Sequence, residues 1–153
     1  MDTIGAVEHR SLRRENRVLA VQWAYMCQLT HWPASSADFP KICALFEKDP
    51  KNFQFAQELV LLMHSHLHEI DALIERFATN WNFSRLSNVD LCVLRLATCE
   101  LLYRPDIPPV VTINEAIELG KLFSGEPSKA FINGILDRIR GTLSRPLRTA
   151  TTA

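Results

Sequence analysis

The chain has 153 residues, of which 47% are hydrophobic and 22% are charged, and its formal net charge at neutral pH is zero. These values predict one globular domain and count against a protein that coats nucleic acid through a general positive field. No apolar run approaches the roughly 20 residues of a membrane span, and the N-terminus carries no signal-peptide core. We therefore expect a cytoplasmic protein without contact to a membrane.

The N-terminal half of the sequence predicts three helices after a flexible arm at residues 1–10, where no periodicity is visible. Apolar residues at helical spacing predict a first helix over Val18 to Leu29. A short second helix is expected around residues 40–47. Apolar residues at steps of three and four then predict one long helix over residues 53–77, because no glycine or proline interrupts it.

The C-terminal half predicts three further helices. Ser87 and the carboxylate three residues later form a capping-box-like start for a helix that continues to Arg104. Residues 108–139 predict two amphipathic helices joined by a short connector. Gly125 can adopt the left-handed conformation of a helix stop, and we expect Ser128 to cap the amide groups of the last helix.

No segment gives a convincing strand, because prolines precede the one β-branched run, at residues 109–112. We therefore predict an all-α fold, a single-domain compact helical bundle of about six to seven helices joined by short loops. The domain is expected to span residues 11–145, between the arm at 1–10 and a flexible tail at 146–153.

Three blocks of sequence, in order along the chain, resemble one protein family. The family pattern INEAIELxKxF followed by FxNGxLD is matched here by Ile113 to Leu119, Lys121, Phe123, Phe131, Asn133, Gly134, Leu136 and Asp137. The segment from Arg13 to Leu29 looks like the family's arginine-led first helix, and Val89 to Leu102 looks like its central helix. The family is that of the NusB transcription antitermination factors. The resemblance implies a NusB-like helical RNA-binding domain.

Basic residues are concentrated near both ends of the sequence. Four arginines accompany one glutamate between Arg10 and Arg17, and five basic residues accompany one aspartate between Lys129 and Arg148. Clustered guanidinium groups either contact successive phosphates or form a solvated helix face. The resemblance favours the first interpretation, because the arginine-rich start of the family is its RNA-facing edge. The implied RNA-binding residues of this edge are Arg10, Arg13, Arg14 and Arg17.

A second RNA-binding segment is implied around Phe131. In the family a phenylalanine at this position contacts RNA bases, and a single-stranded base stacked on an aromatic ring contributes about 1–3 kcal/mol. Lys129 and the amide groups near Ser128 are expected to add phosphate contacts. From the residues alone, Phe131 is equally well the first core residue of its helix.

Two residues match family positions that face a protein partner, the small-subunit ribosomal protein NusE. They are Tyr25 and Asp90. Each also has a local role: Asp90 favours the positive start of its helix beside Ser87, and Tyr25 fits an aromatic at the edge of the core. The family resemblance leaves a homodimer open as well.

The residue patterns of metal sites and enzymes are weak or missing in this sequence. His64 and His68 share a helix face at a spacing that zinc accepts, but His66 points elsewhere and a third ligand is missing. No HExxH, Walker loop, nucleophile elbow or Rossmann glycine pattern occurs. We expect no cofactor, and we interpret the cysteines as buried apolar residues. They are Cys27, Cys43, Cys92 and Cys99.

The preferred hypothesis is a non-enzymatic, RNA-binding transcription antitermination factor. It would bind boxA-type single-stranded RNA of ribosomal RNA transcripts together with NusE, within the RNA polymerase antitermination complex. Two alternatives stay open. Similar helical domains precede methyltransferase modules that act on ribosomal RNA cytosines, so the chain is alternatively a fragment or relative of such an RNA-binding domain. The other alternative is a helical adaptor whose partners are proteins alone.

Overall fold

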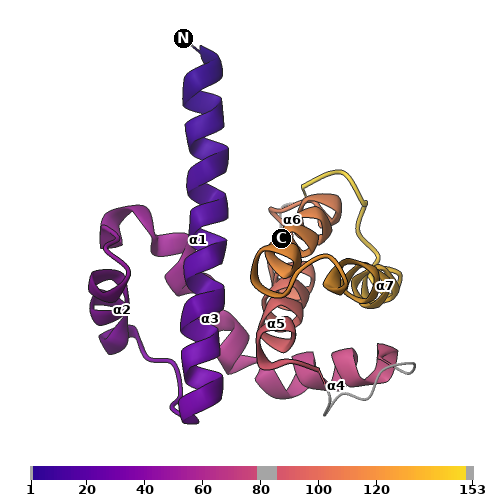
Figure 1. Ribbon diagram of the computed structural model, residues 1–153. Helices are drawn as coiled ribbons and strands as arrows, with labels where there is room; N and C mark the ends of the chain where they lie inside the picture. The colour runs from indigo at the N-terminus through magenta and orange to yellow at the C-terminus, as the bar shows by residue number, and fades with distance from the viewer. Residues whose placement is uncertain (1, 79–85, 151–153) are drawn as a thin grey trace.

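The computed structural model describes residues 2–78 and 86–150, with side chains from Leu12 onward. This part of the chain holds seven α-helices, two short 3-10 helices and no strand, which confirms the all-α prediction (Figure 1). The α-helices are α1 (Asp2–Thr30), α2 (Phe39–Leu45), α3 (Gln54–Ser65), α4 (Leu67–Phe77), α5 (Asn88–Tyr103), α6 (Pro109–Ser124) and α7 (Ser128–Arg140). No described helix has both the length and the apolar character needed to span a membrane.

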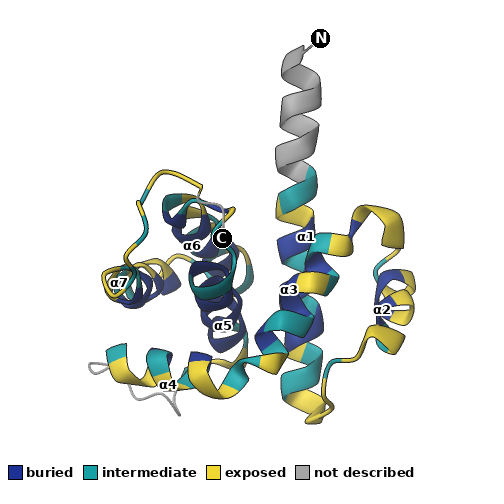
Figure 2. Cartoon of the chain, turned by 180° about the vertical axis from the view of Figure 1, so that it is seen from behind, coloured by how far each residue is buried: buried dark blue, intermediate teal, exposed yellow. Residues whose placement is uncertain are grey.

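Helix α5 is the centre of the fold. Every residue from Asp90 to Leu101 is buried, as the dark ribbon of α5 shows in Figure 2. Five helices pack against it: α1, α3, α4, α6 and α7. The sequence of α5 explains this position, since a helix that is apolar around most of its circumference is stable only when neighbours cover all its faces.

Helix α6 connects the two RNA-binding segments that the sequence predicts, because it contacts both α1 and α7. At Gly120 it lies so near α7 that an added Cβ atom would collide with the Cδ1 atom of Ile132. Ile132 is fully buried. The absence of a side chain at Gly120 therefore allows the two helices to pack directly on one another.

The prediction of one long helix over residues 53–77 is wrong. The helix breaks at His66, which separates α3 from α4. The backbone N–H of His66 donates to the carbonyls of Leu62 and Met63, and its ring stacks on Tyr103 at a centroid distance of 4.0 Å. Packing is the physical reason: α3 lies against α1 and α5, whereas α4 lies against α5 and α7. A single straight helix over residues 53–77 could not make both sets of contacts.

Several predicted helix ends are confirmed, and one is not. Ser87 Oγ accepts a hydrogen bond of 3.1 Å from the backbone N–H of Asp90, as the capping-box pattern predicts. Helix α6 ends before Gly125, whose φ of +100° is one that glycine adopts without strain. Ser128, however, does not cap α7: it is the first residue of the helix, and its hydroxyl donates to Asp90 Oδ1 at 3.1 Å.

Parts of both chain ends that the sequence predicts to be flexible have described structure. Residues 2–10 belong to α1, which begins at Asp2. At the other end, the guanidinium of Arg145 donates to the backbone carbonyls of Arg104 and Ile107 at 3.2 and 3.0 Å. The carbonyl of Leu147 accepts from the backbone N–H of Val110 at 3.0 Å. The chain therefore stays docked on the α5–α6 connection to at least residue 147.

Candidate nucleic-acid interface

The four arginines predicted to bind phosphate have different surroundings, although all of them belong to α1. The side chain of Arg10 lies outside the described residues. The side chains of Arg13, Arg14 and Arg17 are described, and each has a different neighbour. The three environments decide which of these guanidinium groups an RNA phosphate can reach.

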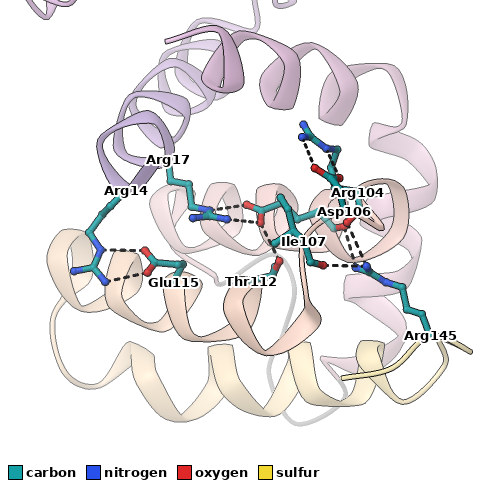
Figure 3. Close-up of polar contacts among 9 residues, drawn as sticks. Arg14, Arg17, Arg104, Asp106, Ile107, Thr112, Glu115 and Arg145 are labelled. Carbon is teal, nitrogen blue, oxygen red and sulfur yellow. Dashed lines mark hydrogen bonds and ion pairs between the residues drawn. The ribbon is translucent and has the colours of Figure 1, made fainter. Parts of the chain in front are cut away.

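Arg17 is buried inside the bundle and is a structural residue. Its Nε and Nη2 atoms each donate to a carboxylate oxygen of Glu100 on α5 at 2.9 Å, and the two side chains are only 5% and 3% exposed. The hydroxyl of Thr112 on α6 donates to the same carboxylate at 2.9 Å (Figure 3). This arrangement gives the predicted RNA contact of Arg17 no support, since its Nε and Nη2 donors are used by Glu100 and its side chain is buried.

Arg14 lies at the surface and joins α1 to α6. Its Nε and Nη2 atoms donate to the two carboxylate oxygens of Glu115 at 3.0 Å each (Figure 3). The hydrogen bond to Glu115 raises the pKa of Arg14 above its usual value. The Arg14 side chain remains 54% exposed. Arg14 is thus accessible to a phosphate, but the phosphate competes with Glu115 for the guanidinium.

Arg13 has an aromatic neighbour in place of a carboxylate. Its guanidinium carbon lies 3.9 Å from the centroid of the Phe55 ring, at the start of α3. Among the described residues, no ion pair joins Arg13 to an acidic group. Burial lowers the pKa of Arg13, and the positive charges of Arg17 and Arg104 lower it further. The carboxylates of Glu100 and Asp106 act in the opposite direction on this pKa. An anion bound beside the partly desolvated guanidinium would stabilise its charged form.

At the start of α7, some of the predicted RNA-binding residues are buried and others are accessible. Ser128 is only 4% exposed and Asp90 only 8%, and the two side chains bond each other. This hydrogen bond fastens α7 to α5 and uses both side chains inside the bundle. The phosphate contacts of the amide groups near Ser128 and the partner contact of Asp90 stay predictions. Lys129 is exposed, and Phe131 is half-buried against the core.

Tyr25 is the predicted partner-binding residue that remains accessible. It lies on α1 and is 37% exposed. Its position is eleven residues beyond Arg14 in the same helix, which corresponds to roughly 17 Å along the helix axis. A surface around Tyr25 is therefore separate from the arginines, so that α1 has room for two binding partners at once.

The arginines of α1 and the start of α7 are linked through α6. Glu115, in the middle of α6, bonds Arg14, while Gly120, nearer the C-terminal end of α6, contacts Ile132 of α7. Figure 3 shows α1, α6 and α7 as neighbouring helices, with Arg14 directed toward α6. Arg14 and α7 thus both adjoin α6, whereas Arg13, one residue before Arg14 in α1, lies against Phe55 of α3.

Sequence reasoning missed three residues that contact the arginines of α1. Glu100 neutralises Arg17, Glu115 binds Arg14 and Phe55 supports Arg13. The only signal for Glu100 was its position as an acidic residue within an apolar run, which indicates a buried charge with a partner. Nothing in the sequence identified the other two contacts.

No cluster of metal-binding side chains accompanies these arginines. Among the described residues, no group of three histidine, cysteine or acidic side chains is placed to hold a metal ion. His66 stacks on Tyr103 and bonds Glu69 at 3.3 Å instead. Cys43, Cys92 and Cys99 are buried as predicted, and Cys27 is half-buried.

Comparison with known proteins identifies the family. The sequence model of the NusB family matches residues 14–140. The chain belongs to the NusB family. A transcription antitermination protein NusB from Myxococcus xanthus is 46% identical over 137 residues, which is 88% of this chain and 98% of that relative. The corresponding NusB protein of Geotalea daltonii is 46% identical over 141 residues, or 87% and 97% of the two chains.

Solved structures have the same fold. NusB of T. maritima superposes with a TM-score of 0.74 at 36% identity, over 87% of this chain and 93% of that one. A crystal structure of antitermination factors NusB and NusE in complex with dsRNA gives a TM-score of 0.74 at 24% identity, over 87% and 98% of the chains. As a NusB-family member, the chain is a transcription antitermination factor and not an enzyme.

Proposed function

We propose that this NusB-family protein binds boxA-type single-stranded RNA of ribosomal RNA transcripts together with NusE, as part of the RNA polymerase antitermination complex. The observation that carries the proposal is a pair of arginines on α1, the half-buried Arg13 and the exposed Arg14, beside the helix that packs against α7. The function is one of assembly: the protein positions RNA and a partner without a chemical step.

RNA binding would combine phosphate contacts with base stacking. Arg10, Arg13, Arg14 and Lys129 would neutralise phosphates, and each neutralised phosphate of a single strand releases counterions. The partly exposed ring of Phe131 would stack on one base. Because the accessible groups are few and the chain has no net charge, we expect weak, salt-sensitive binding by the protein alone.

NusE would increase this affinity by adding its own contacts to the same RNA. The position of Tyr25, far along α1 from the arginines, supports a partner surface that stays free when RNA is bound. A protein of the same fold has been crystallised with NusE and dsRNA, which supports the choice of partners for the test.

The proposal is tested by titrating a fluorescent single-stranded boxA RNA with the protein, with NusE, and with both. We expect the mixture to bind much more tightly than either protein alone, and a scrambled RNA of equal length to bind less tightly. A size-exclusion run at each concentration checks whether the binding species is a monomer, a homodimer or the complex with NusE. Equal affinity with and without NusE would contradict the adaptor function.

A further inference from the structure

Three guanidinium groups surround the ring of Phe55. The guanidinium carbon of Arg13 lies 3.9 Å from the ring centroid, that of Arg104 lies 5.1 Å away and that of Arg17 lies 5.4 Å away. Phe55 belongs to the first turn of α3, whereas the arginines come from α1 and from the residue that follows α5. The ring thus brings together side chains from α1, from α3 and from the residue that follows α5.

Two of the three arginines are neutralised by carboxylates. Arg17 forms the buried pair with Glu100. Arg104 donates through Nε and Nη2 to the two carboxylate oxygens of Asp106 at 2.9 Å each. Arg13 alone has the Phe55 ring in place of a carboxylate among the described residues.

Arg13 is half-buried with its guanidinium over the ring, and no hydrogen bond among the described residues uses its N–H donors. An arginine that lies over an aromatic ring uses the face of its guanidinium, so the N–H groups in the guanidinium plane remain free for a bidentate contact. Glu100 and Asp106 balance the charges of Arg17 and Arg104, so among the described residues Arg13 contributes the net positive charge of this arginine cluster. A phosphate at this point would therefore supply the counter-charge that Arg13 lacks.

We propose that Phe55 is a positioning residue of the RNA-binding site, whose ring holds the guanidinium of Arg13 in the orientation that receives an RNA phosphate. This inference rests on the proposed function. Without the ring, Arg13 must be ordered when RNA binds. Ordering one long side chain on binding weakens an association about 2- to 10-fold, and this is the loss that we expect for Phe55→Leu.

The test is a double-mutant cycle between Arg13 and Phe55, with boxA RNA titrated in the presence of NusE. The variants are Arg13→Gln, Phe55→Leu and their combination. Phe55→Tyr is the conservative variant, because it keeps the ring, and should bind nearly as the wild type does. Phe77→Leu is the matched control: it removes the other ring–arginine pair, in which Arg76 lies 4.9 Å from Phe77 on α4. This control should not change RNA affinity.

Two readouts distinguish positioning from a general loss of structure. In the Arg13→Gln background, Phe55→Leu should cause no further loss of affinity, because the ring acts through the arginine. In Arg13→Gln, the slope of log affinity against log salt concentration should become shallower by about 0.7. In Phe55→Leu, this slope should stay unchanged.

Equal losses from Phe55→Leu in both backgrounds, or no loss in either, would overturn the inference and leave the proposed function intact. Failure of the wild-type complex to bind boxA RNA would overturn both. A melting curve accompanies each titration. If the affinity of a variant falls only at assay temperatures above its melting temperature, the loss reflects unfolding and counts against positioning.

Discussion

Replacement of Arg17 by methionine gives a large and calculable loss of stability. The change leaves the Glu100 carboxylate 3% exposed, with Thr112 as its remaining side-chain donor. Removal of one partner from a buried ion pair costs about 3–5 kcal/mol, because the other charge stays buried without compensation. For a domain of this size, each kcal/mol lowers the melting temperature by about 2–4 °C. We therefore expect a decrease of roughly 6–20 °C.

A second substitution tests the cause of this loss. In the double variant Arg17→Met and Glu100→Gln the unpaired charge is gone, and glutamine still accepts the hydrogen bond from Thr112. Most of the stability should therefore return. Arg14→Gln is the surface control: the Arg14 side chain is 54% exposed in its ion pair, so its loss should cost less than about 1 kcal/mol. Urea denaturation at equilibrium measures all three changes.

The stable double variant also separates structure from RNA binding. We expect it to bind boxA RNA with NusE as the wild type does, because Arg17 does not reach the surface. A loss below about 1 kcal/mol for Arg17→Met alone would refute the reasoning about the buried pair. Weak RNA binding by a fully folded double variant would show that Arg17 contacts RNA after all.

Three further predictions concern α6 and the buried thiols. Glu115→Gln should raise RNA affinity about 2- to 5-fold in a titration with NusE, because it frees Arg14 from a surface ion pair; unchanged affinity would argue against an Arg14–phosphate contact. Gly120→Ala should cost about 1–3 kcal/mol in urea denaturation, because the new Cβ meets the buried Ile132; wild-type stability would contradict this packing. Burial raises the pKa of Cys99 to about 12 from a usual 9.0. Between those values the unfolded chain loses the thiol proton and the folded chain keeps it, so stability falls as pH rises. The stability advantage of the wild type over Cys99→Ala should shrink from pH 9 to pH 12, and a constant difference would contradict this.

The sequence predicted those parts of the fold that depend on neighbouring residues. Ser87 and Gly125 mark helix ends because a side-chain cap and a positive φ are local properties. The break at His66 was not predictable in this way, since no local residue causes it. It arises because α3 also packs against α1 and α4 also packs against α7, and only the folded chain brings these helices together.

The same distinction applies to the arginines of α1. The spacing of Arg13, Arg14 and Arg17 placed them in one helix. It did not show which of them is paired with an acidic residue. Their acidic partners are remote in sequence: Glu100 is 83 positions from Arg17, and Glu115 is 101 positions from Arg14. Which arginine is neutralised, and which stays accessible, is therefore decided by the packing of α1 against α5 and α6.

The most direct test of the RNA-binding account is zero-length ultraviolet crosslinking of boxA RNA to the complex with NusE, followed by mass spectrometry of the crosslinked peptides. The account predicts crosslinks at Phe131 and in the peptides that contain Arg13 and Arg14, with the RNA recovered chemically unchanged. Crosslinks confined to other surfaces, such as the exposed Trp32 after α1, would contradict it.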